Sequence, residues 1–485
     1  MIIEPLSIPN SISIENLFRP LSSMPWAMWL DSCNSAHVDS RFDIITWQPK
    51  VTIETKGDVT FVSEIADIKE RNGSTNTANF HQQKSNCYQS DADPLTILAR
   101  EQQSLFADIT LPAIARSPEQ DNFLPFLGGA LGYFSYDLGH RFEQLPVIAE
   151  RDIDAPDMAV GLYLHAIIFD RKHQSYALVC LDEHKQALLE FIAQQLVAAQ
   201  KITTEMQHFK LTSSWQSNMS KQGYSEKFQQ VQDYLLSGDC YQVNLAQRFS
   251  ANYQGDEYAA YLALRAANKA PFSAFMRFEN TSVLSVSPER FLQLSQGNIQ
   301  SKPIKGTLPR AALPAEDQAL ADKLQQSDKD RAENLMIVDL LRNDISKVAS
   351  PGSVKVPKLF AIESFPAVHH LVSTVEGQLS AEFDATDLLR GAFPGGSITG
   401  APKIRSMEVI EQLEPHQRSV YCGSIGYISA CGNMDTSITI RTLVSHNNNI
   451  YCWVGGGLVA DSKVDSEYQE TFDKVAKILP VLNEL

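Results

Sequence analysis

The chain has 485 residues, of which 44% are hydrophobic and 20% are charged, and this balance is typical of a soluble globular protein. Its formal net charge of −16 argues against a nucleic-acid-binding protein, because such proteins usually present a basic face. The charge does not exclude an anionic small-molecule substrate, since a bound divalent cation inverts the local charge.

Membrane and secreted proteins are also disfavoured. The apolar runs are too short and too polar to cross a bilayer, and the first residues lack the basic segment and apolar core of a signal peptide. The seven cysteines are scattered without a CxxC pair, so we expect neither a zinc site nor a disulfide framework. The sequence therefore predicts a cytoplasmic protein with reduced thiols, which has neither a membrane nor nucleic acid as partner.

The first region, residues 1–210, is rich in predicted strands. Runs of β-branched and aromatic residues between turn signals predict strands at 42–47, 51–57, 158–169 and 175–181. The polar stretch 67–93 has almost no apolar residues and is typical of a long surface loop. A second polar stretch, 203–223, is predicted to connect the two regions.

The second region, residues 215–485, mixes helices and strands in blocks. Apolar spacing predicts helices at 225–236, 331–349, 402–413 and 466–482. Strands are predicted at 273–278, 282–287, 423–429, 436–444 and 450–457. Because strict strand–helix alternation is absent, the sequence predicts an α+β fold with large, mostly antiparallel sheets packed by helices.

Glu333 is a candidate metal ligand. In the predicted helix, Met336, Ile337 and Leu340 follow it at i+3, i+4 and i+7, which places the carboxylate on the apolar stripe. A carboxylate buried there needs a partner, because an unpaired buried charge is costly. A salt bridge to a core Arg or Lys and a divalent cation both satisfy this requirement.

The last predicted helix offers further carboxylates. Glu467, Glu470 and Lys474 lie on one face at i, i+3 and i+7. This spacing suits a solvated face with an ordinary Glu–Lys pair. It also suits Mg²⁺, which prefers oxygen ligands and keeps positions open for water and a substrate carboxylate.

Two glycine-rich segments allow a ligand to approach bare backbone. In 395–403, hydroxyls including that of Ser397 stand beside glycines at the start of a predicted helix, a place that favours anions. Gly455 and Gly456 follow the predicted strand that begins at 450. Most glycine-rich turns are only turns, so neither segment identifies a site by itself.

Two cations complete the candidate set. Strand alternation in 436–444 places Arg441 on a face of small hydroxyls, suited to bidentate binding of a carboxylate, or leaves it exposed at an edge. Lys305 lies between Ile304 and Gly306, and apolar neighbours favour loss of its proton, which would give an amine nucleophile. Most lysines are solvated and inert, so the neighbours of Lys305 in the sequence do not by themselves show that it is a nucleophile.

Together these segments resemble the chorismate-binding enzymes. The motifs that carry the resemblance occur in that family's order: SPERF (287–291), PIKGT (303–307), ENLMIVDLLRND (333–344), HHLVS (369–373), GGSITGAPK (395–403), GYIS (426–429), IRT (440–442), VGGG (454–457) and DSEYQETFDK (465–474). The resemblance runs from about residue 29 to the end of the chain. PIKGT is similar to the motif of aminodeoxychorismate synthases, whereas anthranilate synthases carry Ala at the position of Lys305.

The resemblance implies the following roles. Lys305 attacks C2 of chorismate as the 4-hydroxyl leaves, and ammonia then adds at C4 and expels the lysine. Glu289 is the implied general acid and His370 lies beside the ring. Other matched positions contact substrate (Ser397, Tyr427, Arg441, Gly455, Gly456 and Lys474) or Mg²⁺ (Glu333, Glu467 and Glu470).

The family's tryptophan pocket also has counterparts here. Ser32, Asn244 and Pro271 match places where tryptophan lies in these enzymes. The chain departs from the common Leu-Leu-Glu-Ser motif, having Trp-Leu-Asp-Ser at 29–32. The resemblance of these three positions implies tryptophan as a further ligand.

The chain has no convincing glutaminase motif, so ammonia is expected from solution or from a separate glutaminase subunit. The resemblance leaves two alternatives to the aminating enzyme. One is an anthranilate or isochorismate synthase, which Lys305 disfavours. The other is a non-catalytic regulator that binds chorismate or tryptophan, which would need no nucleophile.

Overall fold

The computed structural model describes residues 1–33, 35, 37, 39–65, 84–113, 123–200, 208–364 and 368–485. Two large sheets, of 13 and 12 strands, form its centre. Neighbouring strands in both sheets are antiparallel. The predicted α+β fold with antiparallel sheets is confirmed.

The first sheet has the strand order β1 (Ile2–Leu6), β10 (Ser175–Cys180), β9 (Ala166–Asp170), β3 (Phe42–Thr46), β2 (Met28–Asp31), β14 (Phe272–Arg277), β15 (Thr281–Ser287), β24 (Thr442–His446), β25 (Asn449–Leu458), β13 (Gln242–Gly255) and β11 (Phe209–Leu211). Two short strands, β12 (Gln216–Ser217) and β21 (Gly400–Ala401), also pair with β13.

The second sheet has the order β18 (Ile304–Pro309), β20 (Val368–Gln378), β17 (Asn298–Ser301), β16 (Arg290–Ser295), β23 (Met434–Ile438), β22 (Ser424–Ser429), β7 (Gly129–Phe134), β8 (Met158–Tyr163), β4 (Val51–Lys56), β5 (Val59–Ile65) and β6 (Lys84–Ser90), and β19 (Lys355–Ser364) pairs with β20. Each sheet joins a block of strands from the first predicted region to a block from the second, and the two blocks meet at the β2–β14 and β7–β22 pairings. The boundary near residue 210 therefore separates two stretches of chain that share both sheets.

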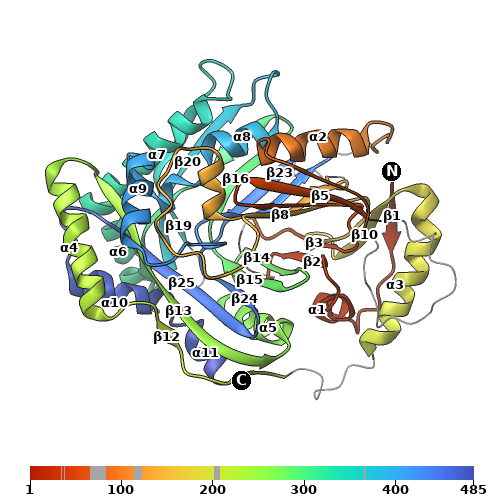
Figure 1. Ribbon diagram of the computed structural model, residues 1–485, viewed down its shortest axis with the longest axis horizontal. Coiled ribbons are helices and arrows are strands. Elements are labelled where there is room, and N and C mark those ends of the chain that lie inside the picture. The colour runs from red at the N-terminus through yellow and green to blue at the C-terminus, as the bar shows by residue number, and fades with distance from the viewer. Residues whose placement is uncertain are drawn as a thin grey trace.

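Helices cover the outer faces and the ends of the sheets. They are α1 (Ile14–Phe18), α2 (Pro94–Phe106), α3 (Lys185–Gln200), α4 (Lys221–Ser237), α5 (Glu257–Asn268), α6 (Pro314–Gln325), α7 (Asp328–Ser346), α8 (Ala385–Ala392), α9 (Lys403–Leu413), α10 (Val464–Lys474) and α11 (Leu479–Asn483). Figure 1 shows α4, α6, α7, α9 and α10 gathered on the left of the sheets, with α1 and α3 on the right.

The first sheet is buried on both faces. Met28 and Val444 belong to the apolar cluster that joins the two sheets, whereas their neighbours Trp29 and Leu443 belong to a cluster shared with α1, α3 and α5. Because successive side chains of a strand point to opposite faces, each strand needs apolar residues at consecutive positions. This explains why the strands of this sheet lack a polar alternation.

The predicted strand 436–444 is two strands in different sheets. β23 ends at Ile438 in the second sheet, and β24 begins at Thr442 in the first. Arg441, in the connection, has a φ of 51°, a left-handed conformation that interrupts a strand. The prediction that strand alternation orients Arg441 was therefore wrong.

Three other local predictions also needed correction. The strand predicted at 158–169 is likewise two strands, β8 in the second sheet and β9 in the first. The helix predicted at 466–482 is divided into α10 and α11, and Pro480 in the first turn of α11 cannot donate a backbone hydrogen bond to a continuing helix. Part of the polar stretch 67–93 forms strand β6, which pairs with β5, while 67–83 lies outside the described residues. Within the described ranges, none of the helices combines the length and apolar character needed to cross a membrane.

The connections between the sheets generate a prediction about stability. The buried Ser287 hydroxyl donates to the Ile438 carbonyl at 2.6 Å, whereas the buried Ser295 hydroxyl has no hydrogen-bond partner among the described residues. Ser287→Ala removes this donor, while the Ile440 amide still donates to the same carbonyl at 2.9 Å, so we expect the free energy of unfolding to fall by about 0.5–1.5 kcal/mol. Urea denaturation should show a smaller loss for Ser295→Ala, and equal losses would contradict this role of the hydrogen bond.

Candidate active site

Two chain segments cross side by side from one sheet to the other and carry Glu289 and Arg441. One segment joins β15 to β16, and the other joins β23 to β24. Backbone hydrogen bonds join them: the Ile438 amide donates to the Glu289 carbonyl at 3.0 Å, and the Val286 amide donates to the Arg441 carbonyl at 3.1 Å. The crossings place a carboxyl and a guanidinium group at the seam between the sheets.

Lys305 reaches this seam from β18. The register of β18 against β20 shifts between Lys305 and Thr307, where Gly306 has a φ of 76°, as in a β-bulge that begins with glycine. The Lys305 Nζ donates to the Ser397 carbonyl at 3.2 Å, and the Ser397 hydroxyl donates to Glu289 Oε1 at 3.0 Å. The predicted nucleophile, hydroxyl and general acid therefore lie together.

The three predicted metal-binding carboxylates come from two helices. Glu333 lies on α7, and Glu467 and Glu470 lie one turn apart on α10. A Cβ atom added to Gly456 would lie 3.3 Å from Glu467 Oε2 and 3.6 Å from both Glu470 Oε1 and Lys474 Nζ. The bare backbone of Gly456 therefore leaves room beside these charged groups.

Lys474 links Gly455 of β25 to the carboxylate of Glu470. Its Nζ donates to the Gly455 carbonyl at 2.9 Å and pairs with Glu470 Oε1 at 2.7 Å. β24 pairs with β25 only as far as the Leu443–Cys452 pair, whereas β25 continues to Leu458. The edge of β25 at Gly455 and Gly456 thus lies beyond the end of β24.

Burial changes the pKa values of this cluster. The pKa of Glu289 is raised by burial, although Lys305 opposes the shift. The pKa of Lys305 is lowered by burial, although Glu289 and Glu333 oppose it. A carboxyl group whose pKa is raised holds its proton more readily, and an amine whose pKa is lowered loses its proton more readily, which suits them to proton donation and nucleophilic attack.

The metal candidates show mutual repulsion. Burial raises the pKa of Glu333, and the charge of Glu467 contributes. Burial also raises the pKa of Glu467, to which the charge of Glu470 contributes. Carboxylates held close together against their repulsion are stabilised by a cation, so this donor set fits Mg²⁺. In the described part of the chain, however, no three potential ligands already converge as a finished metal site.

His370 flanks the cluster on β20. Its Nδ1 lies 2.7 Å from the Thr307 hydroxyl, and burial lowers its pKa to about 4, with a contribution from the charge of Arg441. Burial also lowers the pKa of Arg441, while Glu289 opposes the shift. A neutral imidazole therefore faces the same seam as the guanidinium group.

Sequence reasoning missed two residues that contact the cluster. The Ser462 hydroxyl donates to Glu467 Oε1 at 2.7 Å, and Lys329 Nζ lies 3.9 Å from Glu333 Oε1. The i,i+4 spacing of Lys329 and Glu333 was visible in the sequence. Ser462 lies before the helix, and its spacing to Glu467 carries no such signal.

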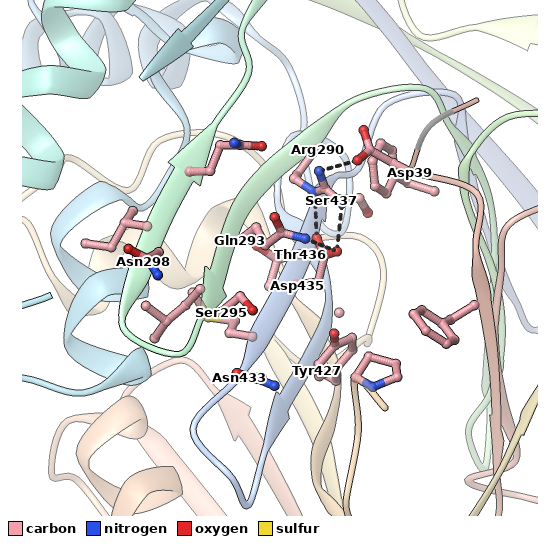
Figure 2. A pocket seen from close by; sticks show the side chains of 18 of the residues that line it. Asp39, Arg290, Gln293, Ser295, Asn298, Tyr427, Asn433, Asp435, Thr436 and Ser437 are labelled. Atoms are coloured by element: carbon pink, nitrogen blue, oxygen red, sulfur yellow. Dashed lines mark hydrogen bonds and ion pairs between the residues drawn. The ribbon is translucent and has the colours of Figure 1, made fainter. Parts of the chain in front are cut away.

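Tyr427 does not join this cluster. It lines a separate cavity of about 1100 Å³, together with Arg290 and Asp435, and Figure 2 shows its side chain there. Arg290 Nε and Nη2 each lie 2.9 Å from an Asp435 oxygen, and Nη1 lies 2.8 Å from Asp39 Oδ1. The predicted grouping of Tyr427 with the chorismate-binding residues was wrong, because its strand directs it to the other side of the seam.

The same cavity contains two of the three predicted tryptophan-pocket residues. Ser32 and Pro271 line it, but Asn244 is absent from the lining residues. Asn244 Oδ1 instead accepts a hydrogen bond from Arg418 at 3.2 Å. The predicted grouping of Asn244 with Ser32 and Pro271 was therefore wrong.

The family model for chorismate binding enzymes matches residues 27–480, and the chain belongs to this family, as its motifs predict. Its closely similar relatives bear a more specific name.

Aminodeoxychorismate synthase component 1 of Klebsiella aerogenes is 54% identical over 465 residues, which cover 96% of this chain and 95% of that protein. The protein of the same name from Escherichia coli K12 is 54% identical over 473 residues, with 97% and 96% covered. Among solved structures, anthranilate synthase component I from Streptococcus pneumoniae TIGR4 is 30% identical, with a TM-score of 0.75 and coverage of 91% of this chain and 93% of that one. The chain is thus similar to enzymes over nearly its whole length.

The environment of Lys305 predicts an unusual pH dependence. Burial lowers its pKa, whereas the pKa of the exposed Lys221 is raised by a hydrogen bond to Asp465. Acetylation followed by mass spectrometry should reach its half-maximal rate at a lower pH for Lys305 than for Lys221. Glu289→Gln should further lower the pH at which the acetylation rate of Lys305 is half-maximal, because it removes an attractive negative charge. Coincident pH curves for the two lysines would contradict the prediction.

Proposed function

We propose that the chain is the large component of an aminodeoxychorismate synthase and converts chorismate and ammonia into 4-amino-4-deoxychorismate, a precursor of p-aminobenzoate and folate. The observation that carries the proposal is the position of Lys305, whose amine lies beside Ser397 and Glu289 with a lowered pKa. Two relatives that are 54% identical carry this name.

The reaction is the one that the family resemblance implies, and the pairing of an amine with a carboxylic acid supports it. The lone pair of the neutral Lys305 amine forms a bond to C2, the ring double bond shifts, and the C4–O bond breaks. Glu289 supplies the proton with which the hydroxyl leaves as water. The lone pair of ammonia then forms the C4–N bond, the double bond shifts back, and the C2–N bond to Lys305 breaks. Proton transfer from the aminated intermediate restores Glu289, and the amine has replaced the hydroxyl.

The substrate carboxylates require cationic partners. Arg441 lies within electrostatic reach of Glu289 and His370 at the seam, and Lys474 lies at the glycine edge of β25. Glu333, Glu467 and Glu470 would bind Mg²⁺, which supplies charge neutralisation for a substrate carboxylate when bound. The clustered carboxylates, of which Glu333 and Glu467 have raised pKa values, support this assignment.

A separate glutaminase subunit would supply the ammonia. Glutamine hydrolysis by a cysteine requires an accessible thiol with a depressed pKa. Cys33, Cys180, Cys240, Cys422 and Cys452 are buried and their pKa values are raised by burial. The component numbering of the relatives' names also supports a partner component. The free thiols suit a reducing compartment such as the cytoplasm.

We also propose that the large cavity binds tryptophan. Apolar side chains, including Phe42 and Phe272, line it together with Asp39 and Asp435, and it is large enough for an indole. The Ser32 hydroxyl donates to Asp43 Oδ1 and accepts from Arg171 Nε, so it is already engaged at the cavity wall. The Ser32 amide also donates to Asp43 Oδ1, at 2.7 Å, so Ser32 would shape the wall of the cavity and leave the polar contacts with the ligand to other residues.

The test of the proposed function is the product formed from chorismate, Mg²⁺ and an ammonium salt. The unaltered chain should form 4-amino-4-deoxychorismate, and Lys305→Ala should form it at least about 100-fold more slowly, with some product aminated at C2, because the amine nucleophile is lost. Lys302→Ala is the matched control, since Lys302 lies outside the cluster and faces Glu363. Glutamine should replace ammonium only when a glutaminase subunit is added.

Three outcomes contradict parts of this proposal. Anthranilate or isochorismate as the product of the unaltered chain would reject the proposed activity and favour the alternative enzymes. Unchanged 4-amino product from Lys305→Ala would reject the nucleophile. Binding of chorismate without turnover would favour a regulator.

The metal assignment gives a separate prediction. Glu333→Gln and Glu470→Gln each remove a carboxylate charge, so we expect the Mg²⁺ concentration for half-maximal rate to rise at least about 10-fold, and excess Mg²⁺ to restore activity only in part. Glu226→Gln, on the exposed surface of α4, is the control and should behave like the unaltered chain. Normal Mg²⁺ dependence in both variants would show that these helices do not bind the metal.

A further inference from the structure

Arg418 is a fully buried cation that contacts no group of the predicted cluster. Its side chain is 1% exposed, and its guanidinium carbon lies 4.7 Å from the ring centre of Tyr136 and 5.7 Å from that of Tyr421. Two hydrogen bonds, of 2.9 and 2.6 Å, join it to both carboxylate oxygens of Glu414. The pair lies at the carboxyl end of α9.

The remaining donors of Arg418 bind two different chain segments. Nη1 donates to the Ile398 carbonyl at 3.1 Å, and Nη2 donates to the Asn244 carbonyl at 3.0 Å and to Asn244 Oδ1 at 3.2 Å. Glu414 Oε1 accepts from the Ala246 amide at 2.9 Å. A single ion pair therefore contacts both the 396–399 turn and strand β13.

These two segments adjoin two groups of active-site residues, which we call the Ser397 wall and the Gly455 wall. Ile398 directly follows Ser397, whose carbonyl accepts from Lys305 and whose hydroxyl donates to Glu289. Asn244 and Ala246 pair across the sheet with Gly457 and Gly455. The Gly455 carbonyl in turn accepts from Lys474. Arg418 thus contacts Ile398, the neighbour of Ser397 in the chain, and Asn244, whose strand pairs directly with the strand that carries Gly455.

We propose that Arg418, oriented by Glu414, is a positioning residue that sets the separation between the Ser397 turn and the Gly455–Gly457 edge, and thereby the rate of the chemical step. This inference rests on the proposed function only in that both concern the same site. A buried ion pair costs desolvation, and apolar residues of similar volume often stabilise a fold as well or better. Those residues lack the planar fork of donors that binds several carbonyl groups at once.

The decisive comparison is between two double variants. Arg418→Met with Glu414→Leu removes both charges while preserving bulk. Arg248→Met with Asp152→Leu removes another bidentate ion pair, whose two hydrogen bonds are 2.7 and 2.6 Å long and whose arginine lies on the same strand, β13. Turnover number, KM for chorismate and free energy of unfolding in urea are measured for both variants and for the unaltered chain, with ammonium as the nitrogen source.

We expect the Arg418/Glu414 variant to stay folded but to lose free energy of unfolding, because the Ile398 and Asn244 carbonyls and the Ala246 amide lose these partners. Its turnover number should fall about 100-fold, with KM changing much less, because small displacements of reacting groups slow the chemistry. The Arg248/Asp152 variant should stay within about threefold of the unaltered rate, since its pair contacts neither wall. A turnover number within about threefold of normal in the Arg418/Glu414 variant would overturn the inference.

Arg418→Lys decides the question if the double variant does not fold. This variant keeps the positive charge but loses the planar guanidinium group with its several donors, so the turnover number should fall while KM stays nearly constant. An unchanged turnover number in a folded Arg418→Lys variant would overturn the inference. The rate ratios are independent of which product forms, so a failure of the proposed function appears in the product analysis and a failure of this inference appears in the ratios.

Discussion

The structure depends on the point where two segments pass side by side between the sheets. The connections β15–β16 and β23–β24 bond to each other through Ile438, Glu289, Val286 and Arg441. Neighbouring residues at such a crossing face opposite directions. Glu289 therefore faces Lys305 and Ser397, whereas Arg290 faces the large cavity and binds Asp435 and Asp39 (Figure 2). One pair of crossings thus contributes polar groups to both pockets.

The candidate active site concentrates charge at the cost of stability. Burial raises the pKa values of Glu289, Glu333 and Glu467 and lowers that of Lys305, so each group is held where its charged form is disfavoured. Such an arrangement persists only where the surrounding structure is rigid. The neighbouring strands β15, β24 and β25 of the first sheet, which are buried on both faces, supply that rigidity. The same groups become useful when a substrate and a cation neutralise them.

Local patterns in the sequence predicted a large part of this architecture. The apolar stripe around Glu333 predicted a helix, and α7 contains it. The i, i+3 and i+7 spacing of Glu467, Glu470 and Lys474 predicted one face of a helix, and all three lie in α10. Both predictions concern contacts within one helix, where the 3.6-residue period determines which side chains are neighbours.

The errors concern residues whose position depends on distant segments. Arg441 was predicted within one strand, but its left-handed conformation carries the chain from one sheet to the other. Tyr427 and Asn244 lie on strands whose two faces are both buried, so polarity does not reveal which face meets which pocket. The sequence by itself determined the chemical inventory and its order: the lysine, the carboxylates, the glycine edge and the elements that carry them. Only the tertiary structure decided which groups share a pocket, because that choice depends on strand register and on crossings between residues more than 100 positions apart.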